Sequence, residues 1–74
     1  MSYVIKIHVH TPGGLGVAFL ADNNGWYAAT NSAQKFSTIN QARAYMRGPQ
    51  APRPPKNWCG SPIIVGPRKG EYSL

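Results

Sequence analysis

Four prolines fall within residues 48–55 of this 74-residue chain, in the order Gly-Pro-Gln-Ala-Pro-Arg-Pro-Pro. Proline fixes its own φ and has no backbone N–H, so a run this dense forbids a helix and disfavours a central strand. The pattern predicts an extended, polyproline-like segment over residues 48–57. Helices and strands are therefore expected on either side of this segment.

The residues near the N-terminus alternate in the manner of a β-strand. Apolar residues occupy the odd positions from Tyr3 to Val9 and are separated by mostly polar ones, which predicts a half-buried strand with its odd positions facing the core. A loop at residues 11–14 leads to a second, antiparallel strand over residues 17–21. Asn24-Gly25 then predicts a type I′ hairpin turn, followed by a third strand over residues 26–30.

One helix is marked at both ends. Ser37 or Thr38 provides the N-cap, and Thr38 followed by Gln41 fits a capping box. Gly48 stands where a C′ residue is expected, and the proline after it cannot continue the helix. A single apolar stripe is formed by Ile39, Ala42 and Met46.

The last strand is expected over residues 63–65, and a flexible tail over residues 67–74. Together these elements predict an α+β fold. We expect a small antiparallel sheet of three to four strands with one helix packed on a face, in the order β-β-β-α-β. The whole chain, residues 1–74, forms a single small domain in this interpretation.

Chain length and cysteine content limit the class of protein. The chain is far shorter than the ~250 residues of a barrel enzyme. Cys59 is the only cysteine, so no disulfide forms within the chain, which fits a reducing compartment. The apolar runs are much shorter than the ~20 residues of a membrane span, and the N-terminus begins in a strand pattern without a signal-peptide core. We expect a soluble, cytoplasmic protein with no membrane partner.

The residue types that carry chemistry are sparse. His8 and His10 point to one face of a strand and Cys59 is a third potential zinc ligand, but a structural zinc site needs four ligands and Cys-x-x-Cys is absent. Asp22 and Glu71, the only carboxylates, fall in a predicted turn and in the tail. We therefore expect a protein that is not an enzyme, with no catalytic residue, metal, cofactor or small-molecule substrate.

Positive charge is abundant and unevenly placed. Eight Lys and Arg against two Asp and Glu give a net charge of +6, and seven of the eight follow residue 34. Such a field favours nucleic acid or an acidic protein surface. A solvated face and a contact surface both remain open as explanations. The candidate partner-binding residues are Lys35, Arg43, Arg47, Arg53, Lys56 and Trp58.

A sheet edge offers a different kind of contact. The short strand at residues 63–65, or the strand that starts at Tyr3, is a candidate for pairing with an extended segment of another protein. The sequence does not decide which edge is free.

Residues 3–47 resemble small bacteriophage-encoded proteins. The shared pattern is Tyr3-Val4-Ile5, then Gly25-Trp26-Tyr27, then Ala33-x-Lys35-Phe36-Ser37-Thr38 leading into Gln41-Ala42-Arg43-Ala44-Tyr45. The proline run and the tail lie outside the resemblance. Such proteins are host-takeover factors, and the nearest in size, layout and basic character are phage regulators of bacterial RNA polymerase, of the kind that a Xanthomonas phage encodes.

This resemblance implies a protein of the host cytoplasm that binds host RNA polymerase. It would inhibit sigma-dependent transcription initiation, act as an antiterminator, or both, with nascent RNA or DNA as a possible further contact within the complex. Two alternatives stay open. One is a phage anti-defence inhibitor of the anti-CRISPR type, and the other is a protein that binds DNA or RNA directly, with an affinity that falls steeply with salt.

Overall fold

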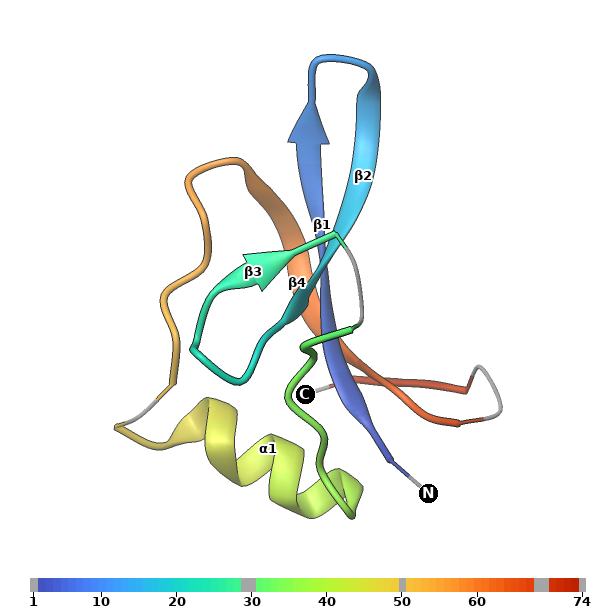
Figure 1. Ribbon diagram of the computed structural model, residues 1–74, viewed down its shortest axis with the longest axis vertical. Helices are drawn as coiled ribbons and strands as arrows, with labels where there is room; N and C mark the ends of the chain where they lie inside the picture. The colour runs from blue at the N-terminus through green and yellow to red at the C-terminus, as the bar shows by residue number, and fades with distance from the viewer. Residues whose placement is uncertain (1, 29–30, 50, 68–69, 74) are drawn as a thin grey trace.

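The computed structural model describes residues 2–28, 31–49, 51–67 and 70–73. Its elements are β1 (Val4–Thr11), β2 (Gly14–Leu20), β3 (Trp26–Tyr27), α1 (Ile39–Arg47), β4 (Trp58–Val65) and β5 (Glu71–Ser73). The five strands form one antiparallel sheet in the order β3-β2-β1-β4-β5, with β1 at its centre (Figure 1). The predicted α+β class is confirmed, but the sheet has five strands rather than three to four.

The alternation that predicted β1 matches its burial. Ile5 and Ile7 are fully buried and Val9 nearly so, whereas Lys6 and His8 on the opposite face are only partly buried. β2 runs antiparallel to β1, with Ile7 opposite Ala18, and it begins at Gly14, three residues earlier than expected. The longer pairing brings the two strands together directly after the turn at Pro12-Gly13.

The loop between β2 and β3 differs from the predicted type I′ turn. That turn needs a positive φ at both central residues, and in this loop only Asn24, at 64°, has one. The Asn24 N–H donates to the Ala21 carbonyl and the Ala21 N–H to the Gly25 carbonyl, which closes a three-residue loop. The Tyr45 hydroxyl of α1 also donates to the Asn24 side chain. β3 stops at Tyr27, and the last two residues of the expected strand lie outside the described residues.

Thr38 caps α1 as predicted, but the Gln41 side chain bonds to the residue before the N-cap rather than to Thr38 as in a standard capping box. Thr38 Oγ1 accepts the Gln41 backbone N–H at 3.1 Å, and Gln41 Oε1 accepts the Ser37 N–H at 3.0 Å. At the other end, Gly48 is the C-cap itself, with a φ of −88°, so the helix ends in extended backbone rather than at a left-handed glycine.

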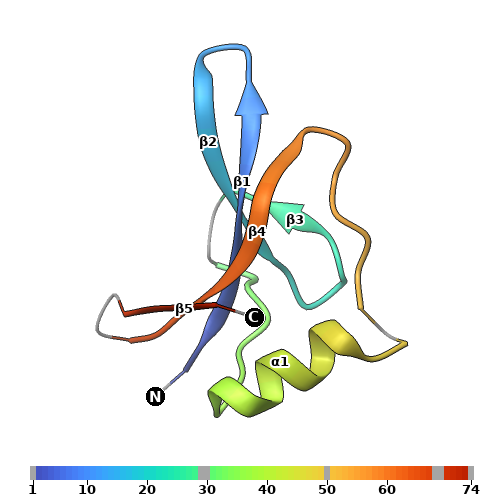
Figure 2. The same cartoon turned by 180° about the vertical axis from the view of Figure 1, so that it is seen from behind.

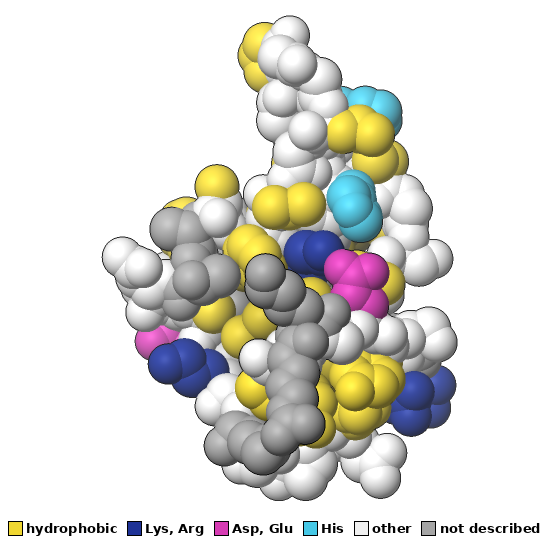
Figure 3. Space-filling model, turned by 90° about the vertical axis from the view of Figure 1, so that its right-hand side faces the viewer, with side chains coloured by type: hydrophobic (Ala, Val, Ile, Leu, Met, Phe, Trp, Pro, Cys, Tyr) yellow, Lys and Arg dark blue, Asp and Glu magenta, His cyan; other side chains and the backbone are white. Residues whose placement is uncertain are grey.

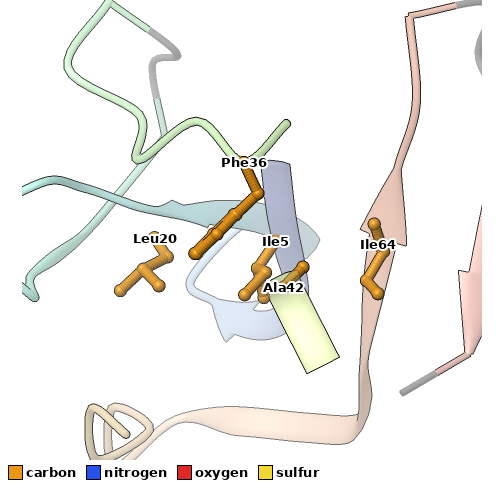
Figure 4. Close-up of a cluster of buried hydrophobic side chains, with 5 residues drawn as sticks. All are labelled: Ile5, Leu20, Phe36, Ala42 and Ile64. Atoms are coloured by element: carbon orange, nitrogen blue, oxygen red, sulfur yellow. The ribbon is translucent and has the colours of Figure 1, made fainter. Parts of the chain in front are cut away.

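α1 lies across one end of the sheet and completes the core (Figure 2). The predicted helix stripe faces the sheet, with Ala42 fully buried and Ile39 and Met46 partly buried. The main cluster of buried side chains draws on both halves of the chain and consists of Ile5, Leu20, Phe36, Ala42 and Ile64 (Figure 4).

The C-terminal part carries more strand than expected. β4 covers eight residues rather than the predicted 63–65, and its register on β1 shifts between Lys6 and His8, near Gly60 with its φ of 72°. Glu71–Ser73, assigned from the sequence to a flexible tail, are corrected to an edge strand paired with β4. The Tyr72 ring packs edge-on against Tyr3, with centroids 6.2 Å apart, a contact that no local pattern reveals.

Candidate binding surface

The proline-rich segment lies against the sheet and is fixed by backbone groups. In the described residues 51–57 it forms neither helix nor strand, as predicted. The Trp26 indole N–H donates to the Arg53 carbonyl at 2.9 Å. Nearer β4, the His10 N–H donates to the Asn57 carbonyl, and Asn57 Nδ2 donates to the His10 carbonyl, both at 2.7 Å. The segment is therefore held at two points between the end of α1 and the start of β4.

Four of the six predicted site residues follow this path. Arg47 ends α1, Arg53 and Lys56 belong to the proline-rich segment, and Trp58 begins β4; all four are exposed. We call these four residues the basic strip. The two views show the strip's part of the chain on the opposite side of the molecule from β5 (Figures 1 and 2).

The cations of the proline-rich segment have no acidic partner in the part of the chain that the structure describes. Among the described residues, neither Arg53 nor Lys56 makes an ion pair, and the ion pair that is present joins Lys6 to Glu71. Arg47 lies in the last turn of α1, where the negative end of the helix dipole favours a cation. Within the strip, Arg53 and Lys56 thus present positive charge for which the described residues supply no acidic partner.

The other two predicted residues are placed elsewhere. Arg43 is half-buried, and its guanidinium donates from Nε and Nη2 to the Ser73 carbonyl at 3.3 and 3.1 Å, so it holds β5 to the helix. Lys35 is exposed but precedes the helix, whose nine residues span about 13 Å. Lys35 therefore lies at the other end of α1 from the basic strip.

The face of the sheet opposite α1 is polar in its middle. His8 pairs in register with Val17 on one side and Cys59 on the other, and Lys6 Nζ lies 2.8 Å from Glu71 Oε2. The hydrogen bond from Lys6, and then its charge, hold the pKa of Glu71 below its usual value. Figure 3 shows the two histidines above an adjoining cationic and acidic side chain. No group of three or more His, Cys, Asp or Glu side chains in the described ranges is arranged to hold a metal ion.

Two features of the surface were missed by sequence reasoning. A hollow of about 350 Å³ is lined by Asp22, Asn23, Tyr27, Asn31 and Ser32, and none of the predicted site residues contributes to it. Leu15, Val17 and Tyr27 are exposed by 69%, 37% and 50% and lie on one face of the sheet. The alternation of Leu15 and Val17 along β2 was the available signal, but it does not say which face of the sheet the helix covers.

The two predicted sheet edges are wrong. Residues 63–65 pair with β1 on one side and β5 on the other, and β1 is the central strand. The edge strands are β3 and β5. Their shortness explains the error, because neither has enough residues to show a clear alternation.

The chemistry of the basic strip is that of binding. Guanidinium and ammonium groups recognise carboxylates and phosphates, and an exposed indole offers a flat apolar face beside them. No helix among the described residues has the length and apolar character to cross a bilayer. No protein-family model, curated protein or solved structure matches this chain.

Proposed function

We propose that this chain is a non-enzymatic regulator that binds host bacterial RNA polymerase in the host cytoplasm, and that the basic strip makes the contact. The observation that carries the proposal is the charge of Arg53 and Lys56, which form no ion pair with a described residue and lie on a chain of net charge +6. Such a field attracts acidic protein surfaces and nucleic-acid phosphates, and a transcribing polymerase presents both. The resemblance of residues 3–47 to phage regulators of this enzyme supports the choice of partner.

In this proposal the chain regulates transcription by occupying a site on the polymerase. A small domain docked where sigma factor binds prevents sigma-dependent initiation. A domain docked beside the path of the emerging RNA places its cations near phosphates, which favours antitermination. In both cases the chain makes and breaks no covalent bond.

A protein partner explains the strip better than naked nucleic acid. With three phosphate contacts, one for each cation of the strip, log K falls with log salt with a slope of only about −2.7. Three such contacts give little affinity at physiological salt. A protein surface adds apolar contact with Trp58, which is 40% exposed.

The experiment is a gel-filtration binding assay with purified Xanthomonas RNA polymerase, as core enzyme and as holoenzyme. We expect the chain to co-elute with the core enzyme and to compete with sigma factor for it. A duplex DNA and a single-stranded RNA, tested alone, should bind at least about tenfold more weakly, which is about 1.4 kcal/mol. Absence of co-elution at low salt would overturn the proposal, and binding to nucleic acid alone with equal affinity would favour a direct DNA or RNA binder.

A further inference from the structure

In the part of the chain that the structure describes, no strand lies beside the outer edge of β2 over most of its length. β3 pairs only with Phe19 and Leu20, so among the described residues nothing pairs with Gly14 to Ala18 on that side. Figures 1 and 2 both show this part of the β1–β2 hairpin projecting beyond the rest of the sheet. In an antiparallel strand, alternate residues direct their N–H and C=O groups to opposite neighbours. Because Phe19 pairs with Tyr27 of β3, Leu15 and Val17 direct their groups to that same side, where the described residues provide no partner strand.

This edge lacks the protection that the other free edge has. The stretch of β4 beyond β5 contains Gly60 in a left-handed conformation, a register shift, and Pro62. Irregularities and prolines of this kind prevent strand pairing. The β2 stretch reads Gly-Leu-Gly-Val-Ala, with no proline and no charge. It is a ready template for another strand.

Exposed apolar side chains collect along the same edge. Leu15 is 69% exposed, Val17 37% and Tyr27, on the neighbouring β3, 50%. All three lie on the face of the sheet away from α1, since Leu15 and Val17 pair with His10 and His8, and Tyr27 with Phe19. A strand added to β2 would cover apolar surface as well as satisfy backbone groups.

Charge selects the occupant. The Gly14–Ala18 stretch has no cation that would attract an acidic segment or a phosphate. A strand that pairs with it favourably is therefore uncharged and apolar on one face. The β2 strand of a second copy is itself uncharged and apolar on one face. Because each molecule has a net charge of +6, contact through this uncharged stretch also keeps the cations of the two copies from meeting. We propose that two copies of this chain associate through the outer edges of β2, paired antiparallel across a two-fold axis.

The position of the axis follows from β3. Because β3 occupies the edge from Phe19 onward, the overlap is confined to the residues before it. If the two-fold axis passes beside Leu15, β3 of each copy lies outside the overlap between the two β2 strands. This axis places Leu15 of one copy against Leu15 of the other, so that the most exposed of the large apolar side chains becomes the centre of the contact. The overlap is short, and the association is therefore weak and dependent on concentration.

The test is sedimentation equilibrium of the full chain between about 10 µM and about 1 mM, the range in which a weak interface becomes populated. The wild type should rise from monomer toward dimer mass. Leu15→Lys should raise the dissociation constant at least about tenfold through like-charge repulsion at the axis. Ser61→Lys is the matched control, because it adds the same charge at an exposed site on the stretch of β4 beyond β5. This variant should have the same dissociation constant as the wild type.

Hydrogen exchange of the wild type tests the pairing without a substitution. The amide of Leu15 should exchange at least about tenfold more slowly at the highest concentration than at the lowest, because pairing with Leu15 of the second copy protects it. The amide of Ser61 should show no such change. A monomer mass throughout the range, an equal loss of association in both lysine variants, or concentration-independent exchange at Leu15 would each overturn the inference.

Discussion

Lys6 Nζ lies 2.8 Å from Glu71 Oε2, and this ion pair joins the central strand β1 to the edge strand β5 across β4. The lysine side chain is 16% exposed and the glutamate 55%. The contact is made near the C-terminus of the chain, together with the Tyr3–Tyr72 ring contact and the Arg43 hydrogen bonds to Ser73. These three contacts explain why residues 71–73 form a strand.

Removing the lysine should change the titration of its partner. Lys6 lowers the pKa of Glu71, first by its hydrogen bond and then by its charge. We expect Lys6→Met to raise this pKa toward the usual glutamate value, measured by NMR titration of the Glu71 carboxyl carbon. Because the folded-state pKa is depressed, the stabilisation is present at neutral pH and is lost as the pH falls through the folded-state pKa. Lys35→Met is the control, and an unchanged Glu71 midpoint in Lys6→Met would contradict the assignment.

The helix cap gives a second prediction. Thr38→Ala removes the Oγ1 atom that accepts the Gln41 N–H, and should lower the free energy of unfolding by about 1 kcal/mol. Urea denaturation followed by circular dichroism measures this loss. Ser37→Ala is the control, since Ser37 contacts Gln41 through its backbone N–H, which the substitution retains. Equal losses in the two variants would show that Thr38 is not the N-cap.

Trp26 should hold the proline-rich segment in place. Trp26→Phe keeps an aromatic ring in the core but removes the N–H that bonds to the Arg53 carbonyl, worth about 1 kcal/mol net. We expect faster hydrogen exchange at the amides of Arg53, Lys56 and Asn57, and weaker polymerase binding because the strip is less ordered. Trp58→Phe retains the Trp26 bond and should leave exchange in the segment unchanged. If Trp26→Phe leaves exchange there unaltered, the bond does not order the segment.

The core gives a prediction from adjacent residues. Ile64 is fully buried against Ile5 and Ala42, whereas Ile63 lies on the other face of β4 and is only partly buried. Ile64→Ala should therefore cost about 2–5 kcal/mol, a large share of the stability of so small a domain. Ile63→Ala should cost less. Thermal denaturation compares them, and a greater loss in Ile63→Ala would mean that the sheet faces are assigned the wrong way round.

Local signals in the sequence were sufficient for part of this fold. The capped helix and the alternation of β1 were correctly predicted because a few neighbouring residues determine each of them. The fifth strand was not predictable in this way. Its supports are Tyr3, Lys6 and Arg43, all distant in the chain, and its own three residues are too few to show a pattern.

The same distinction applies to the candidate site. Charge along the chain correctly indicated exposed cations at Arg53 and Lys56. It did not separate them from Arg43, whose partner is a backbone carbonyl 30 residues away. The free edge of β2 was also hidden, because it depends on where β2 begins and on the turn that follows it, and both differ from the prediction.

The central claim is tested most directly by the affinity of RNA polymerase for charge variants of the chain, measured at one fixed salt concentration. Arg53→Gln combined with Lys56→Gln should weaken binding at least about tenfold, or about 1.4 kcal/mol. Lys35→Gln, which removes an exposed charge at the other end of α1, should bind as the wild type does. Equal affinities for the double variant and the wild type would contradict the claim that the basic strip is the docking surface.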